Sequence, residues 1–233
     1  MTRPHRDPDP AARGAGGHRA ARTGAAVALV AAAVCYASWL LAPVLNPGLR
    51  PVRSYLSELA ARDQPYHLVF QLGDVTTGLC ATAAGLLLAR VAREVPRPAW
   101  WGLLVFGVAT AVDGGWTSMD CAPSIDDRCA RLEELGELSW RHQAHTVTSS
   151  VAVAGALLSA VAVLAVLRGP ARRRAGLSVA VVLAVGTVGT LVATLHPEWG
   201  LGLWQRVQLA GLSGWLLLTA AVARWGPGPE RQR

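Results

Sequence analysis

Polar and ionisable side chains recur at helical spacing in three otherwise apolar stretches of the chain. Residues three, four or seven positions apart lie on one face of an α-helix, so the members of each set are expected to face the same way. The sets are His67, Gln71 and Asp74; Asp113, Thr117 and Asp120; and His142, His145 and Ser149. Carboxylates, imidazoles and hydroxyls exchange protons, bind metal ions and act as nucleophiles. These three faces therefore form the candidate functional site.

One chemistry that these residue types permit is metal-assisted hydrolysis. His142 and His145 lie one helical turn apart, and a zinc ion would need at least one further donor, such as His196 or an aspartate. A bound zinc ion lowers the pKa of its water molecule towards ~7. Asp74 or Asp113 would then act as a general base or would orient a metal ligand. Zinc is accordingly the candidate cofactor.

Six apolar segments must position these residues, each near the ~20 residues that a helix needs to cross a bilayer. They cover 24–45, 67–89, 99–119, 143–167, 176–196 and 204–223. The chain is 52% hydrophobic and only 16% charged, whereas soluble domains are about a quarter charged. The predicted fold is therefore all-α, a polytopic bundle of six transmembrane helices over 24–223, with membrane lipids as its surroundings.

The arginines predict how this bundle is oriented. Fifteen of the 22 lie in the arm 1–23, the short loops 90–98 and 168–175, and the tail 224–233. The other seven lie near the loops 46–66, 120–142 and 197–203. The positive-inside rule then places both termini in the cytoplasm and predicts a multi-pass protein of the cell membrane. It also explains the net charge of +7 without nucleic-acid binding. The arm 1–23, which lacks apolar periodicity, is predicted to be disordered.

The depths of the polar residues predict a pocket near the non-cytoplasmic face. At a rise of ~1.5 Å per residue, Asp74, Asp113 and Ser149 each lie ~9–10 Å from that end of their segments. Buried charges in a bilayer usually face the bundle interior and have partners. The alternative is that the acids only fix helix packing through hydrogen bonds. Arg141 and Arg206 are expected at the pocket rim, paired with acids of the loop 120–142.

The four cysteines are of two kinds. Cys35 and Cys80 lie inside apolar segments and are expected to pack as small hydrophobic residues. Cys121 and Cys129 lie in one polar loop with seven residues between them. In an oxidising compartment this pair predicts a disulfide. A zinc site is the weaker interpretation, because zinc-binding cysteines are usually spaced more closely.

Three short motifs give the chain a family resemblance. An S-x-x-S-E-L segment follows the first apolar segment, a D-C pair follows the third, and H-x-x-H-x-x-x-S opens the fourth. Together with the six segments, these motifs resemble the domain-of-unknown-function 998 family of multi-pass membrane proteins over about 24–223. A fainter likeness connects the chain with membrane hydrolases of the alkaline-ceramidase type, which use a serine, an aspartate and three histidines with zinc. That likeness implies catalytic roles for Ser57 and Asp120. The chain departs from it in having six segments and H-x-x-H spacing.

Three classes of function remain open at this point. A non-catalytic sensor, assembly factor or partner subunit needs neither metal nor substrate, and it is the preferred prediction. A metal-dependent hydrolase would act on a lipid or a lipid-linked substrate. A proton-coupled transporter would use the buried aspartates to bind the coupling ion, although no internal repeat is visible in the sequence. Nothing in the sequence identifies a protein partner.

Overall fold

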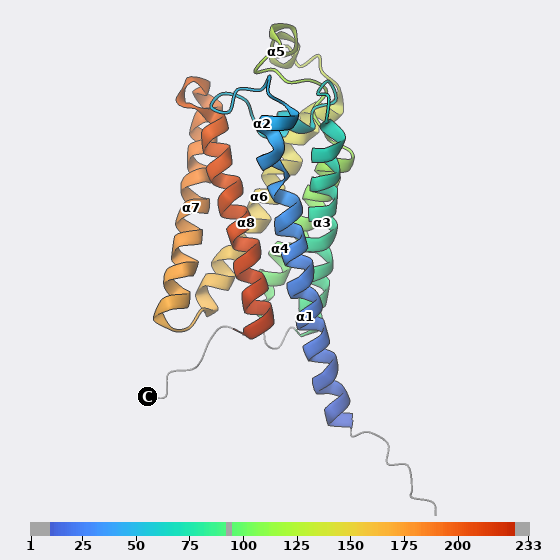
Figure 1. The fold of residues 1–233 in the computed structure, drawn as a ribbon, viewed down its shortest axis with the longest axis vertical. Coiled ribbons are helices and arrows are strands. Elements are labelled where there is room, and N and C mark those ends of the chain that lie inside the picture. Colours follow the sequence, from blue (N-terminus) through green and yellow to red (C-terminus); the bar gives the residue numbers. More distant parts are fainter. Residues whose placement is uncertain (1–9, 92–94, 227–233) are drawn as a thin grey trace, which may run out of the picture.

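The computed structural model describes residues 10–91 and 95–226, and these form helices and connecting loops. Among the described residues, five stretches are long and apolar enough to cross a membrane: Gly16–Leu45, His67–Arg90 (α3), Trp140–Val166 (α6), Pro170–Leu195 (α7) and Leu201–Trp225 (α8). Arg97–Gly115 (α4) is a shorter helix within the same bundle (Figure 1). The chain is therefore an all-helical, multi-pass membrane protein.

The first helix differs from its prediction at both ends. It begins at Pro10 as α1 (Pro10–Tyr36), so 10–23 of the arm predicted as disordered is helical; 1–9 lie outside the described residues. Alanines such as Ala20 and Ala21 have the highest helix propensity, which favours this extension. Beyond Tyr36 the chain continues as a 3-10 helix, Ala37–Leu41 (η1), and a short helix, Ala42–Leu45 (α2).

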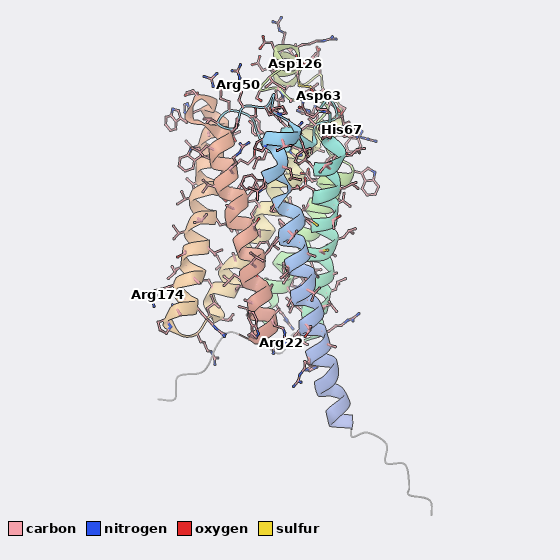
Figure 2. All side chains as sticks on the ribbon, viewed as in Figure 1. Arg22, Arg50, Asp63, His67, Asp126 and Arg174 are labelled. Carbon is pink, nitrogen blue, oxygen red and sulfur yellow. A yellow bond between two sulfur atoms is a disulfide. The ribbon has the colours of Figure 1, made fainter. Side chains whose placement is uncertain are left out.

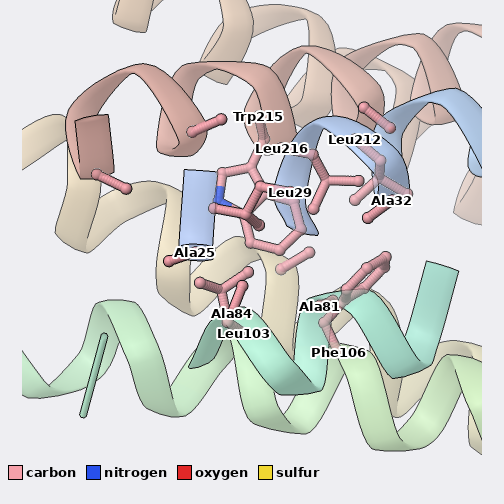
Figure 3. Packing of buried hydrophobic residues seen from close by; sticks show 14 of the residues in the cluster. Ala25, Leu29, Ala32, Ala81, Ala84, Leu103, Phe106, Leu212, Trp215 and Leu216 are labelled. Carbon is pink, nitrogen blue, oxygen red and sulfur yellow. The ribbon is translucent and has the colours of Figure 1, made fainter. Parts of the chain in front are cut away.

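The helices follow one another around the bundle in the order α7, α8, α1, α3, α4, α6. Their centre is filled by apolar side chains from α1, α3, α4 and α8 (Figure 3). Phe106 has edge-to-face contacts with Tyr36 at 5.7 Å and Trp215 at 5.1 Å between ring centroids. This geometry is favoured between aromatic rings, and it connects α1, α4 and α8 across the core.

Glycines allow α3 and α4 to pack backbone against backbone. A Cβ atom placed on Gly107 would lie 2.5 Å from the Thr82 nitrogen, and one on Gly78 would lie 2.4 Å from the Gly107 oxygen. Small residues at helix crossings are the usual means of close packing in membranes. The helices that carry Asp74 and Asp113 are thus held unusually close together.

The two ends of the bundle differ in character. At one end, here called the loop end, lie the cap loop (46–66) and the long loop between α4 and α6 (116–139). The cap loop contains the 3-10 helix Ser57–Ala60 (η2), and the long loop contains Asp127–Glu134 (α5). At the other end, here called the basic end, α8 finishes, and Arg22 and Arg174 lie there (Figure 2). A last 3-10 turn, Pro197–Trp199 (η3), joins α7 to α8 at the loop end.

Candidate functional site

A small cavity lies below the cap loop, among the helix ends of the loop end. Its volume is about 90 Å³, which is room for several water molecules. It is lined by Tyr36, Ser38, Trp39, Leu56, Ser57, Leu59, Ala60, Phe70, Asp74, Asp113, His145, Ser149, Gln205 and Leu209. The sequence-predicted residues Asp74, Asp113, His145, Ser149 and Ser57 therefore share one cavity, and the remaining predicted site residues lie elsewhere.

Asp113 is the best-satisfied polar group of the cavity. Its Oδ1 atom lies 2.9 Å from Nδ1 of His145 and accepts hydrogen bonds from the hydroxyls of Thr117, at 3.0 Å, and Thr148. Both Asp113 and His145 are largely buried, at 14% and 15% exposure. An imidazole that donates through Nδ1 keeps Nε2 as the ring atom that can exchange a proton. Asp113 and His145 form what we call the Asp–His pair.

Asp74 adds a second carboxylate to the same cavity. It lies on α3, where the close approach of α4 puts the Cβ of Asp74 only 2.7 Å from a Cβ atom built on Gly114. Asp74 interacts electrostatically with both Asp113 and His145. If the Asp–His pair is an ion pair, it is neutral overall, and an ionised Asp74 would add one negative charge to a cavity whose described lining contains no arginine. A proton taken up at the cavity would remove that charge.

The cap loop covers the cavity and is attached to the helices by side-chain hydrogen bonds. Gln71 of α3 donates from Nε2 to the Ala60 oxygen at 2.8 Å, and Gln205 of α8 accepts from the Leu56 nitrogen. Leu56, Ser57 and Ala60 consequently form part of the cavity wall. Gln71, predicted on the same face as Asp74, thus holds the cap loop in place above it.

Glu58 fastens the cap loop to the long loop, a role that the sequence did not reveal. Its side chain is fully buried and accepts hydrogen bonds from the Ser124 nitrogen at 2.9 Å and from the Ser124 hydroxyl. Ser54 lies 2.7 Å from the same hydroxyl, and Asp63 accepts from the Ala122 nitrogen at 3.1 Å. The two loops therefore form one polar joint. The available signal was the acid next to Ser57 in the S-x-x-S-E-L motif.

Burial raises the pKa of Glu58 above its ordinary value of 4.5, although the hydrogen bonds from Ser124 oppose this shift. The folded chain then binds the Glu58 proton more tightly than the unfolded chain does. The contribution of Glu58 to the free energy of unfolding is accordingly fully present below pH 4.5 and is lost as the pH rises through the raised pKa.

We expect Glu58→Gln to remove this part of the pH dependence, because the amide has the same shape and does not titrate. Thermal unfolding of purified protein across a pH series measures the effect. Glu134→Gln, at an exposed position of α5, is the matched control and should leave the curve unchanged. A Glu58→Gln curve as steep as that of the wild type would contradict the assignment.

His142 and Asp120 hold the long loop and do not reach the cavity. Asp120 accepts hydrogen bonds from the Ser139 nitrogen and hydroxyl at 2.8 and 2.9 Å, immediately before α6. Nδ1 of His142 lies 3.1 Å from the backbone nitrogen of Asp120, and Nε2 of His142 lies 3.2 Å from Oε1 of Glu133. The face predicted to carry Asp113, Thr117 and Asp120 is interrupted because α4 ends at Gly115. Gly115 is the second of two adjacent glycines, and glycine has low helix propensity.

The predicted pair Cys121 and Cys129 is joined by a disulfide in the structure, with a Cα–Cα distance of 6.1 Å. The bond closes the segment that leads into α5. Cys129 is buried in the first turn of that helix. The side chain of Asp126 caps the helix by accepting hydrogen bonds from the backbone nitrogens of Arg128 and Cys129. The long loop is thus braced by the disulfide, the Asp126 cap and the contacts of Glu133.

The remaining predicted residues have partners other than the expected ones. His196 lies 3.4 Å from Glu198 and stacks on Trp199. Arg206 donates to the backbone oxygens of Pro51 and Gly202, so it secures the cap loop instead of pairing with an acid. Arg141 lies over the exposed ring of Trp140, at 5.7 Å from the ring centroid. Backbone carbonyls and an aromatic face satisfy these two arginines without a carboxylate.

The predicted zinc ligands are not brought together. His145 pairs with Asp113, His142 with Glu133, and His196 with Glu198. Within the described ranges there is no group of three or more His, Cys, Asp or Glu residues that could hold a metal ion. Because a zinc site needs three or four such donors around one point, the residues of the cavity do not fit this cofactor.

Comparison with known proteins agrees with the membrane architecture. The model of the family described as "Protein of unknown function (DUF998)" matches residues 29–222, which covers most of the chain. The chain belongs to this family, as its motifs suggested. No curated protein and no solved structure gives a significant match.

Proposed function

We propose that this protein is a non-catalytic membrane sensor or partner protein whose cavity takes up and releases a proton. The observation that carries the proposal is that two carboxylates, Asp74 and Asp113, and the imidazole of His145 line one small cavity. Ionisable groups inside membrane spans are expensive to bury, which makes them functional candidates by default. The cap loop rests on this cavity, so a change in its charge would act directly on the surface of the protein.

The composition of the cavity supports a proton-binding sensor better than it supports a zinc hydrolase or a proton-coupled transporter. A zinc hydrolase would require a set of donors that the described residues do not supply. A transporter would require a polar route to the basic end. Below the cavity, however, Tyr36 contacts Phe106, and Phe106 contacts Trp215 in the apolar core. A polar cavity at the loop end, with an apolar core below it, is better suited to sensing than to transport.

We expect pH-difference infrared spectroscopy of the protein in lipid nanodiscs to detect a protonated carboxylic acid that disappears on deprotonation. Asp74→Asn should remove one component of this band, because it deletes one of the two carboxylates that line the cavity. Glu58→Gln identifies any contribution to the band from Glu58, which connects the cap loop to the long loop. Asp127→Asn, at an exposed position of α5, is the control and should leave the difference spectrum intact. A spectrum that is identical in wild type and Asp74→Asn would refute proton binding at the cavity.

We further propose that α4 spans the membrane with the other five helices and that both termini are cytoplasmic. The arginine-rich basic end supports this orientation through the positive-inside rule, and the disulfide at the loop end is consistent with an oxidising compartment. The cell membrane is the proposed location. Reporter fusions after Arg97, Arg173 and the C-terminus should all read as cytoplasmic. A non-cytoplasmic signal at Arg173 would rule this topology out.

A further inference from the structure

The disulfide of the long loop encloses the residue that holds the cap loop. Cys121 and Cys129 close a ring of the chain that contains Ser124. Ser124 donates to Glu58 from its backbone nitrogen at 2.9 Å and from its hydroxyl, and the Glu58 side chain is fully buried. The disulfide and the joint between the two loops are therefore parts of one small structure.

Further hydrogen bonds between the two loops lie at the Cys121 end of this ring. The Arg62 nitrogen donates to the Met119 oxygen at 3.0 Å, and the Ala122 nitrogen donates to Asp63 at 3.1 Å. Ala122 follows Cys121 directly in the chain and is completely buried. This end of the ring is thus attached to the cap loop.

The other end of the ring belongs to α5. Cys129 lies in the first turn of α5, and Glu133 of the same helix lies 3.2 Å from His142 of α6. α5 stands farther from the bundle than the cap loop does (Figure 1). The disulfide therefore connects the segment that holds the cap loop to a helix that contacts α6. Once this bond is broken, the segment gains more conformational freedom on opening, because the chain is no longer closed into a ring.

A change at the joint would reach the cavity through the cap loop. Ser57 and Leu59, the two neighbours of Glu58 in the chain, both line the cavity. The cap loop is also tied to α3 and α8 through Gln71 and Gln205. Loss of the joint would therefore loosen the cap loop around Glu58 without detaching it from the bundle.

We propose that reduction of the Cys121–Cys129 disulfide loosens the cap loop and opens the polar cavity to water. The step is thiol–disulfide exchange with a dithiol reductant at the loop end. The bond between the two sulfur atoms breaks and both cysteines become thiols, while the thiols of the reductant form a disulfide and supply two electrons and two protons. The reductant reaches Cys121 first, because Cys121 is half-buried whereas Cys129 is only 2% exposed.

The consequence of this switch rests on the proposed function, since an open cap loop would expose the Asp–His pair to protons from the aqueous phase. The loosening of the cap loop itself does not depend on proton uptake. The two proposals are therefore tested by different measurements.

Hydrogen-exchange mass spectrometry of the full chain in lipid nanodiscs, with and without dithiothreitol, tests the switch. We expect exchange in 54–64 to become about tenfold faster on reduction, a change within the usual contribution of a disulfide. The loop 168–175 at the basic end is the internal control and should exchange at the same rate in both conditions. Unchanged exchange in 54–64, or equal acceleration in both segments, would overturn the proposal.

Two cysteine variants show whether the reductant acts on this disulfide. Cys121→Ser/Cys129→Ser should exchange rapidly in 54–64 without dithiothreitol and should not respond to it. Cys35→Ala/Cys80→Ala, which removes the two free cysteines, is the matched control and should respond like the wild type. A response to dithiothreitol that persists in Cys121→Ser/Cys129→Ser would count against the switch.

Ser124→Ala shows whether the disulfide acts through the joint. The substitution removes the hydroxyl that is bonded to Glu58 and leaves both cysteines in place. Dithiothreitol should then accelerate exchange in 54–64 less than in the wild type, because coupled groups are not additive. Equal acceleration in the two proteins would contradict the coupling. The infrared experiment is read separately: loss of the Asp74 assignment would refute proton binding, and a cap loop that ignores reduction would refute the switch alone.

Discussion

Replacement of Asp113 with alanine is expected to lower the free energy of unfolding by about 3–5 kcal/mol, the range for removing one partner of a buried ion pair. The substitution takes the acceptor away from His145, Thr117 and Thr148 at once. Asp74 remains in the same cavity, but His145 loses the carboxylate that is hydrogen-bonded to its Nδ1. The measurement is the unfolding transition of the purified protein in detergent, followed by intrinsic fluorescence.

Two controls make this prediction specific to the Asp–His pair. Asp127→Ala removes an exposed acid from α5 and should change the transition by well under 1 kcal/mol. The double variant Asp113→Ala/His145→Ala should be more stable than the sum of the two single changes implies, because it leaves no unpaired imidazole. Equal stability of Asp113→Ala and Asp127→Ala would show that the pair contributes nothing.

Replacement of Gly107 with alanine should cost about 1–3 kcal/mol, the usual range for overpacking, and should push α3 and α4 apart. The added methyl group would lie 2.5 Å from the nitrogen of Thr82 and 2.7 Å from the oxygen of Gly78. Both are backbone atoms of α3, so no flexible side chain can yield. The loss is measured by the same unfolding transition and by the yield of monodisperse protein.

Gly115→Ala is the matched control, because it is the same substitution in the same helix. There the nearest atom to the new methyl group, on Val75, lies 3.6 Å away, which is ordinary contact. Gly115→Ala is therefore expected to be tolerated. If both variants unfold alike, the close approach of α3 and α4 does not limit stability. Since Asp74 and Asp113 lie on these two helices, Gly107→Ala should also alter the pH-dependent infrared signal.

Helical periodicity was enough to predict the centre of the cavity. Asp74, Asp113, His145 and Ser149 lie in helices of the membrane bundle, and polar side chains there have to turn towards one another because lipid offers no hydrogen bonds. The spacing of such residues along a helix is readable directly from the sequence. Their depth follows from the constant rise of the helix.

Residues in the loops could not be assigned in the same way. Asp120 and His142 have the types and spacing of site residues, yet hydrogen bonds to Ser139, Glu133 and backbone groups place them in the long loop. Which loop atoms meet is decided by contacts between distant segments, such as Glu58 with Ser124. Periodicity carries no information about these contacts.

The cavity residues from the first and last helices were missed for another reason. Tyr36, Ser38 and Trp39 lie where α1 passes into a 3-10 helix, which changes the angle between successive side chains. A helical projection therefore puts them on the wrong face. Gln205 lies beside Arg206 and gave no separate signal, since a single glutamine near the end of a span is common at membrane surfaces.

The shortness of α4 has a consequence for how the protein is made. With 19 residues, an internal aspartate and several glycines, this helix is not among the five described stretches that are long and apolar enough to cross a membrane by length and composition. Its hydrogen-bonding partners, His145 and Thr148, belong to α6, which the ribosome synthesises later. Membrane insertion of α4 should therefore be completed only when α6 emerges, with α3 retaining it until then. Nascent chains that stop before α6 should leave α4 accessible to modification from the aqueous phase, whereas chains that include α6 should protect it.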